Sequence, residues 1–425
     1  MYQTVLGVSM GVDYSTLGGV RPPAAPWGTE RVRCNPNLAE RLAEQIPRRN
    51  EIALVLGAGG ALAPDVLHGL LRRASVVIGI DKQLTYTVDG VLYRAVDLNR
   101  PQEITNFFAH LHTFMQENQL KIGACYDLAT IQTSATDGAD RGALTVGKQA
   151  LINALCEFDQ DIRLIYMSTA EVYGAPEGAP YDEEHIQEPI NVYGRHKRAE
   201  EHAVVQAHGQ STGRGKLYVT ALRTWTISMV NYDAHGNVIG TRNYNDPMIS
   251  LAEKLARSGV KLPVPAPESQ AQFHPSEEVA EVLVHFGEQA LTAACWGRPF
   301  NCIGQPTSHG AMRDICNEVF ANGEEASTSG FAQIVNHFSP VVAVSVGVVA
   351  RWAHRVRWLG ATRFGERLPF LYRSTHIDGG DLRAVLGPML SHPDGSQSED
   401  AVRALCQGLR KGGQDALNIK RYAMY

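Results

Sequence analysis

Four short apolar runs stand out in the first half of the chain, at residues 52–56, 76–80, 124–126 and 164–167. Segments with helical periodicity separate them. Continuous apolar runs without polar alternation indicate strands that are covered on both faces. The pattern therefore predicts an α/β fold, with a doubly wound parallel sheet of the Rossmann type flanked by helices.

The pattern also suggests how the chain is divided. Residues 1–50 lie before the first apolar run and are expected to form an N-terminal extension. Residues 51–225 are expected to form the dinucleotide-binding Rossmann domain with the catalytic residues. Pro and turn signals become denser after residue 225, as in 231–247 and 263–267. Residues 226–425 should therefore form mainly a smaller C-terminal α/β substrate lobe, with segments such as strand 300–303 returning to the Rossmann domain.

Composition narrows the class of protein. The 425 residues carry a formal charge of -5 with a pI near 6.3, which gives no reason to expect nucleic-acid binding. The seven cysteines show no metal-ligand spacing, and His110 and His112 have no neighbouring ligands, so no metal site is expected. No signal peptide or long apolar span is apparent, which favours a cytoplasmic protein without stable membrane insertion.

A glycine-rich loop follows the first apolar run, and a helix can begin directly after it. Glycine lets the backbone approach a pyrophosphate, and the helix N-terminus favours an anion. Asp81 ends the second run about twenty residues further on, where a carboxylate can bind the adenosine ribose. This carboxylate would repel a 2′-phosphate and favours NAD over NADP, although the neighbouring Lys82 tempers the preference. The expected cofactor contacts in the loop are Gly57, Gly60, Ala61 and Leu62.

A second group of residues carries acid–base chemistry. Tyr193 and Lys197 are four residues apart and share a helical face. A tyrosine with an ordinary pKa near 10 is a poor base at neutral pH, so a nearby ammonium is useful to stabilise the phenolate. Thr169, which follows the fourth apolar run, can then hold a substrate alcohol by hydrogen bonding.

Together these motifs resemble the extended short-chain dehydrogenases/reductases of the NAD-dependent epimerase/dehydratase family, over residues 51–386 or so. Further carriers of the resemblance are Arg223, the segment 272–280 and the segment 300–304, which resembles the substrate-lobe strand of the family. The resemblance implies that Tyr193 is the general base, that Lys197 lowers its pKa and binds the nicotinamide ribose, and that Thr169 holds the reacting oxygen. It also implies a homodimer and four more cofactor contacts, which are Asp97, Leu98, Leu128 and Ala129.

Glu171 bears on the type of reaction. In dehydratases and decarboxylases of this family a Glu stands two residues after the Thr, where it assists chemistry at carbon 5. The resemblance thus implies an NAD-dependent enzyme that oxidises a hydroxyl of a nucleotide sugar, at carbon 4, and then epimerises, dehydrates or decarboxylates the ketone. The alternative is that Glu171 points to solvent or caps a turn. Ala170 stands where standard dehydratases carry an Asp.

Other departures keep different functions open. Ala63 replaces the third glycine of the loop, while Thr226 and Ala271 stand where many relatives bind the nucleotide diphosphate. The segment Arg223–Thr224–Trp225 is similar to the sugar-nucleotide reductase branch. Residues 339–371 combine an apolar run with arginines and resemble an insertion of sterol-type relatives, so a dehydrogenase or reductase of a hydrophobic alcohol is one alternative. A non-catalytic NAD-binding sensor is another.

Overall fold

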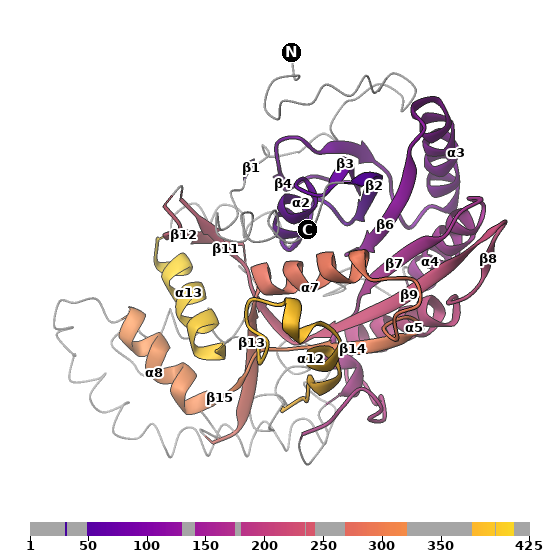
Figure 1. The fold of residues 1–425 in the computed structure, drawn as a ribbon. Coiled ribbons are helices and arrows are strands. Elements are labelled where there is room, and N and C mark those ends of the chain that lie inside the picture. The colour runs from indigo at the N-terminus through magenta and orange to yellow at the C-terminus, as the bar shows by residue number, and fades with distance from the viewer. Residues whose placement is uncertain are drawn as a thin grey trace, which may run out of the picture.

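In the computed structural model the chain forms a large parallel sheet with helices on both faces and a smaller mixed lobe beside it (Figure 1). The structure describes residues 30–31, 49–129, 141–174, 180–233, 235–242, 268–320, 376–395 and 397–411. Seven parallel strands form the large sheet in the order β5-β3-β2-β6-β7-β9-β14. In chain order these strands are β2 (Arg49–Leu56), β3 (Ala74–Asp81), β5 (Leu92–Ala95), β6 (Lys121–Asp127), β7 (Ile162–Met167), β9 (Gly215–Thr224) and β14 (Arg298–Cys302).

The side chains of each central strand alternate between two cores. Along β2, Ala53 and Val55 face a core shared with α2 (Ala63–Leu70) and α7 (Ser276–Glu288), whereas Leu54 and Leu56 face the core on the other side. This second core is covered by α3 (Pro101–Asn118), α4 (Arg141–Cys156) and α5 (Val192–Gln206). Both faces of β2 are therefore dry, which explains its continuous apolar run.

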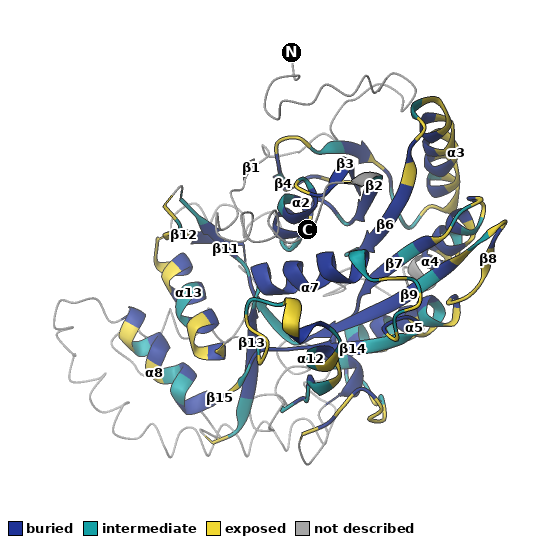
Figure 2. Cartoon of the chain, in the orientation of Figure 1, coloured by how far each residue is buried: buried dark blue, intermediate teal, exposed yellow. Residues whose placement is uncertain are grey.

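The helices follow from amphipathic spacing and clear end signals. In α3 the buried residues are Ile104, Phe107, Phe108, Leu111, Phe114 and Met115, which lie on one face at helical spacing. Pro101 occupies the first turn, and the helix ends at Gln119, whose φ of 52° is left-handed. By contrast, α7 is buried along nearly all its length because it lies between the large sheet and the smaller lobe (Figure 2).

The smaller lobe is built around a three-stranded sheet in which β13 (Gln270–Pro275) pairs with β10 (Thr226–Ser228) and β15 (Pro306–Ser308). A hairpin of β11 (Val230–Tyr232) and β12 (Val238–Thr241) lies beside it. The helices α8 (His309–Phe320) and α13 (Ser398–Lys411) share a core with β13. The short elements are β1 (Glu30–Arg31), β4 (Tyr86–Thr87), β8 (Ser211–Thr212), η2 (Ala170–Tyr173), α12 (Gly380–Leu386) and η4 (Gly387–Met389).

The predicted Rossmann sheet with a smaller C-terminal lobe is confirmed. Residues 300–302 lie in β14, which pairs with β9 as the seventh parallel strand of the large sheet rather than with the sheet of the smaller lobe. No helix among the described residues is both long and apolar enough to span a bilayer. The segment 339–371, and residues 1–29 and 32–48 of the expected N-terminal extension, lie outside the described residues.

We expect Phe300 to be a main support of the edge strand β14. Its ring is fully buried, and its centroid lies 5.3 Å from that of Phe286 on α7. The variant Phe300→Ala should lose about 3–5 kcal/mol of unfolding free energy, because the transfer and cavity costs add. Urea unfolding checks this, with the exposed substitution Val146→Ala as a control that should change stability by less than about 0.5 kcal/mol. Equal unfolding midpoints for both variants would contradict the assignment.

Candidate functional site

The glycine loop between β2 and α2 is packed too tightly for side chains at two positions. Gly57 has a φ of +78°, and a Cβ there would come within 2.7 Å of the Ala129 nitrogen. A Cβ on Gly59 would lie 2.1 Å from the Gln83 carbonyl oxygen. The loop is also tied to the next strand, because the Gly57 N–H donates to the Ile80 carbonyl at 2.8 Å. Glycine is therefore required here by the backbone path itself.

Asp81 fixes this loop from the end of β3. Its carboxylate accepts hydrogen bonds from the N–H groups of Gly59 at 3.0 Å and Gln83 at 3.2 Å. Burial raises the pKa of Asp81, and these backbone hydrogen bonds oppose that shift. The next residue, Lys82, is exposed. Asp81 thus keeps a half-buried carboxylate beside the loop.

The four other expected cofactor residues lie at the same edge of the sheet. Asp97 and Leu98 follow β5, whose end is tied to β3 by the hydrogen bond from Val96 N–H to the Asp81 carbonyl at 3.2 Å. Leu128 and Ala129 follow β6, where the Leu128 N–H donates to the Leu56 carbonyl at 3.0 Å. All four side chains are half-buried. The structure therefore gathers the residues that the sequence placed on four separate strand ends.

The start of α2 lies next to a buried ion pair with the smaller lobe. Leu62 is the N-cap residue and provides no side-chain capping hydrogen bond. One turn further, Asp65 pairs with Arg242, which follows β12, at 2.6 Å, and both side chains are fully buried. Burial, and then the charge of Asp65, raises the pKa of the nearby Glu277 to about 7. No sequence motif points to this cluster, because its members are far apart in the chain.

Thr169 and Glu171 are held by the turn after β7. The Thr169 hydroxyl accepts from the Glu171 N–H at 3.3 Å and donates to the Thr224 carbonyl at 3.4 Å. The Glu171 carboxylate accepts from the Asn191 amide at 2.5 Å, and Asn191 also caps α5 by accepting from the Gly194 N–H at 2.7 Å. Glu171 is half-buried, so it neither points freely to solvent nor merely caps its own turn.

Lys197 lies in the interior, against the end of β7. Its ammonium donates to the Met167 carbonyl at 2.8 Å and to the Tyr166 hydroxyl at 3.2 Å, and its side chain is 3% exposed. Burial lowers the pKa of Lys197 to about 8, although the nearby Glu200 opposes this shift. Tyr193 is half-buried on the same helix and lies close enough to Tyr166 to contribute to the raised pKa of that residue, after burial and Glu200. The turn after β7 and the first half of α5 thus lie next to each other at the carboxyl end of β7.

A second buried ion pair, between Arg223 and Glu201, supports the turn after β7. Arg223, at the end of β9, donates to Glu201 of α5 at 2.6 Å and to the Tyr173 hydroxyl at 2.5 Å. Ser168 donates to the same carboxylate at 2.5 Å. Since all four side chains are buried, they hold the turn after β7 against α5 and β9. In the sequence, Arg223 stands out only through the family resemblance, and no motif points to Glu201, Asn191, Tyr166 or Glu200.

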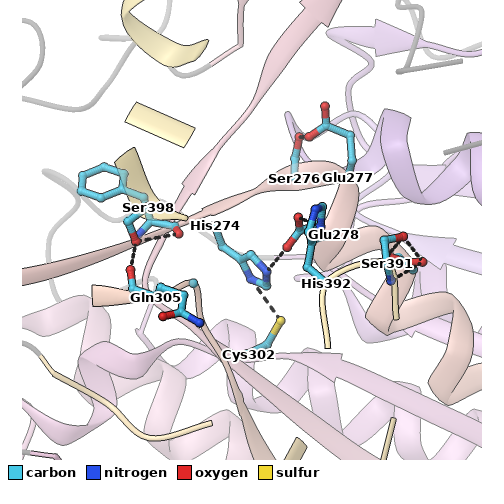
Figure 3. Close-up of polar contacts among 12 residues, drawn as sticks. His274, Ser276, Glu277, Glu278, Cys302, Gln305, Ser391, His392 and Ser398 are labelled. Carbon is cyan, nitrogen blue, oxygen red and sulfur yellow. Dashed lines mark hydrogen bonds and ion pairs between the residues drawn. The ribbon is translucent and has the colours of Figure 1, made fainter. Parts of the chain in front are cut away.

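A separate polar chain runs from the surface to the boundary between the smaller lobe and β14 of the large sheet (Figure 3). His392, 55% exposed, contacts Glu278 at 2.5 Å, Glu278 contacts His274 at 2.9 Å, and the other ring nitrogen of His274 lies 3.3 Å from the buried Cys302 sulfur. A cavity of about 20 Å³ borders the two histidines and Glu278. This space suffices for about one water molecule.

The carboxyl edge of the large sheet fits a dinucleotide. Gly57 and Gly59 let the backbone of the loop pack closely against the residues that follow β6 and β3, and α2 begins directly after the loop, with its N-terminus at the same edge. The Asp81 carboxylate has lone pairs beyond its two backbone hydrogen bonds, which suit ribose hydroxyls. Among the described residues, no group of three or more His, Cys, Asp or Glu side chains is arranged to hold a metal ion.

Known sequences match the part of the chain that contains the glycine loop, Thr169, Tyr193 and Lys197. The family model described as the RmlD substrate binding domain matches residues 51–213. A dTDP-4-keto-6-deoxy-D-glucose reductase from Streptomyces niveus is 31% identical over 155 residues, which are 36% of this chain and 46% of that enzyme. The match thus spans less than half the length of this curated relative.

Solved structures extend the likeness in fold to most of the chain. A UDP-glucose 4-epimerase from Thermotoga maritima aligns with a TM-score of 0.56 at 15% identity, covering 85% of this chain and 100% of that chain. A dTDP-glucose 4,6-dehydratase from Bacillus anthracis, solved with NAD, has a TM-score of 0.54 at 13% identity over 86% and 98% of the two chains. RMD from Pseudomonas aeruginosa, solved with NADPH, has a TM-score of 0.52 at 16% identity over 86% and 100%. At these identities the likeness shows the fold.

We expect His274 to make stability depend on pH. Burial alone would lower the pKa of His274, but Cys302 and Glu278 raise it to about 10, from 6.5 for an ordinary histidine. The resulting stabilisation is fully present below pH 6.5 and is lost as the pH rises through about 10. Urea midpoints of the native protein should therefore fall over this range more steeply than those of His274→Gln. The exposed substitution His110→Gln is the control, and identical pH slopes for all three proteins would refute the assignment.

Proposed function

We propose that this chain, which belongs to the extended short-chain dehydrogenase/reductase superfamily, is an NAD(P)-dependent enzyme that exchanges a hydride with a sugar nucleotide. The observation that carries the proposal is the placement of Thr169 and the Lys197 ammonium at the carboxyl end of β7, at the same edge as the glycine loop and Asp81. Dinucleotide-dependent chemistry needs this arrangement, in which the catalytic residues and the residues that bind the cofactor lie at one edge of a parallel sheet.

The chain's own residues would divide the work in a simple way. A bound nicotinamide cofactor supplies the hydride acceptor or donor. The Tyr193 hydroxyl exchanges a proton with the substrate oxygen, and Thr169 holds that oxygen by a hydrogen bond. The Lys197 ammonium provides the positive charge that favours the phenolate form of Tyr193. The backbone around Gly57 and Gly60 and the side chains of Ala61 and Leu62 line the path of the pyrophosphate.

For the net reaction, the first of two candidates that we propose is reduction of a keto sugar nucleotide. The identity of 31% to a dTDP-4-keto-6-deoxy-D-glucose reductase supports this direction. The side chain of Ala170 is buried and offers no acid for dehydration. One oxygen of Glu171 accepts from Asn191, which gives this carboxylate a structural reason to be there.

A redox-neutral reaction is the second candidate, and Glu171 is the observation in its favour. The carboxylate lies two residues after Thr169 in the turn that carries the proposed site, and only one of its oxygens is engaged by Asn191. It would assist epimerisation, dehydration or decarboxylation next to a ketone formed at carbon 4. The two candidates differ in cofactor balance: the reductase consumes one reduced cofactor for each product, whereas the redox-neutral enzyme consumes none.

For the cofactor, we propose NAD. The Asp81 carboxylate at the end of β3 is suited to ribose hydroxyls and would repel a 2′-phosphate. The exposed ammonium of Lys82 beside it would attract that phosphate, and structures of the same fold have been solved with NAD and with NADPH. Asp97, Leu98, Leu128 and Ala129 remain proposed contacts with the cofactor. A homodimer, and a cytoplasmic location, likewise remain proposals.

We expect Tyr193→Phe to lower turnover by about 10²–10⁴-fold, because general acid–base catalysis contributes about that much. The affinity for the dinucleotide should stay within a few-fold, since the ring is kept. Consumption of NADH and NADPH with a panel of keto sugar nucleotides, together with product analysis by mass spectrometry, measures both. Tyr218→Phe, on β9 outside the site, is the matched control. Full turnover by Tyr193→Phe would reject the mechanism, and isomerised product without cofactor consumption would select the redox-neutral candidate.

We expect Asp81→Asn to weaken NADH binding by about 10- to 100-fold, since hydrogen bonds to a charged group are worth about 1.5–3 kcal/mol. The same change should reduce discrimination against NADPH, because the repulsion of the 2′-phosphate is lost. Titration calorimetry with both cofactors gives the two affinities. A native protein that binds NADPH more tightly than NADH would overturn the choice of NAD.

A further inference from the structure

Four buried charges surround the ring of Tyr166, just below the proposed catalytic residues. Lys148 comes from α4 and Asp127 from the end of β6, whereas Lys197 and Glu200 come from α5. All five residues are at most 4% exposed. We call this group the charge frame, and it consists of Asp127, Lys148, Tyr166, Lys197 and Glu200.

The contacts within the charge frame are direct. The Tyr166 hydroxyl donates to Glu200 at 2.6 Å and accepts from the Lys197 ammonium at 3.2 Å, so it links the two charges. The ammonium groups of Lys197 and Lys148 lie 4.8 Å and 5.1 Å from the centre of the Tyr166 ring. The Lys148 ammonium in turn forms a very short hydrogen bond with Asp127. Two cations and two carboxylates therefore occupy one dry region.

Glu200 is only partly hydrogen-bonded within the charge frame. One of its oxygens faces the Tyr166 hydroxyl and lies 4.0 Å from the Lys197 ammonium. Its other oxygen is buried and has no hydrogen-bond partner in the described part of the chain. A buried carboxylate that is only half satisfied costs free energy, so its role is best sought in the group it faces.

We propose that Glu200 and Tyr166 are positioning residues that hold the Lys197 ammonium protonated against the end of β7, that the Lys148–Asp127 pair opposes them, and that the balance sets the pH range in which Tyr193 works. The last clause rests on the proposed function, whereas the first stands on the charge frame alone. The groups that face Lys197 are Glu200 and Glu201 from α5, Tyr166 from β7, Asp127 from β6 and Lys148 from α4.

The neighbouring groups shift the pKa of Lys197 in opposite directions. Burial lowers the pKa of Lys197 to about 8, Glu200 raises it again, and Lys148 lowers it by more than its partner Asp127 raises it. Removing the Glu200 charge should therefore make Lys197 lose its proton at lower pH. Neutralising the Lys148–Asp127 pair should have the opposite effect. Damage to packing alone would not move two titrations in opposite directions.

The first test is the pH dependence of turnover in the full-length protein with its dinucleotide. In Glu200→Gln the alkaline limb of the profile should move about one pH unit or more toward acid, as expected for losing a charge 4.0 Å away in the interior. In the double variant Lys148→Met/Asp127→Asn it should move toward alkali. Glu157→Gln, an exposed carboxylate just beyond α4, should leave the limb in place. Equal shifts in both buried variants, or no shift in either, overturn the proposal.

A second test needs neither substrate nor turnover. Lysine labelled with ¹³C at Cε reports the titration of Lys197 by NMR, and its signal is assigned by its absence in Lys197→Met. The same opposite shifts are expected in this titration. If they appear while no sugar nucleotide is converted, the charge frame is upheld and the proposed function fails. If Glu200→Gln does not fold, Tyr166→Phe replaces it, and an unchanged Lys197 titration in that variant overturns the role of the Tyr166–Glu200 link.

Discussion

The site depends on one constraint, the common direction of the strands in the large sheet. Because β2, β3, β6 and β7 run parallel, their carboxyl ends meet at a single edge. The loop at Gly57, the Asp81 carboxylate and the turn at Thr169 are therefore close in space although they are far apart in sequence. Each strand is buried on both faces, so the edge is held in place by two cores rather than by local contacts.

Much of the fold was predictable because its signals are local. The apolar runs that became β2, β3, β6 and β7 needed only their own sequence, and so did the glycine turn, whose conformation follows from positive φ at Gly57. The sequence predicts that strand 300–303 returns to the Rossmann domain, but it does not identify β9 as its neighbour, because the pairing partner of a short strand is decided by tertiary contacts. The family match at residues 51–213 falls on the part with local signals, whereas the smaller lobe is recognised by its shape alone.

The residues proposed to act on the substrate could be predicted from the sequence, whereas the buried residues that hold them in place could not. Tyr193, Lys197 and Thr169 could be named because their spacing carries chemistry. Tyr166 and Glu200 could not, since their contact joins residues 34 positions apart on a strand and a helix. A usable signal was nevertheless present: Glu200 stands three residues after Lys197, on the face of α5 that the proposed catalytic lysine already marks as buried. The hydrogen bond from Asn191 to Glu171 could not be predicted either, because no motif spacing relates these two residues.

The ion pair of Asp65 and Arg242 ties the two lobes of the molecule together. Both charges are fully buried, and removing one partner of such a pair by substitution leaves an uncompensated buried charge at a cost of about 3–5 kcal/mol. Asp65 lies in the first turn of α2, beside the glycine loop, whereas Arg242 belongs to the smaller lobe. The pair therefore joins the smaller lobe to the helix that follows the glycine loop. The position of the smaller lobe and the start of α2 are thus coupled through two buried charges.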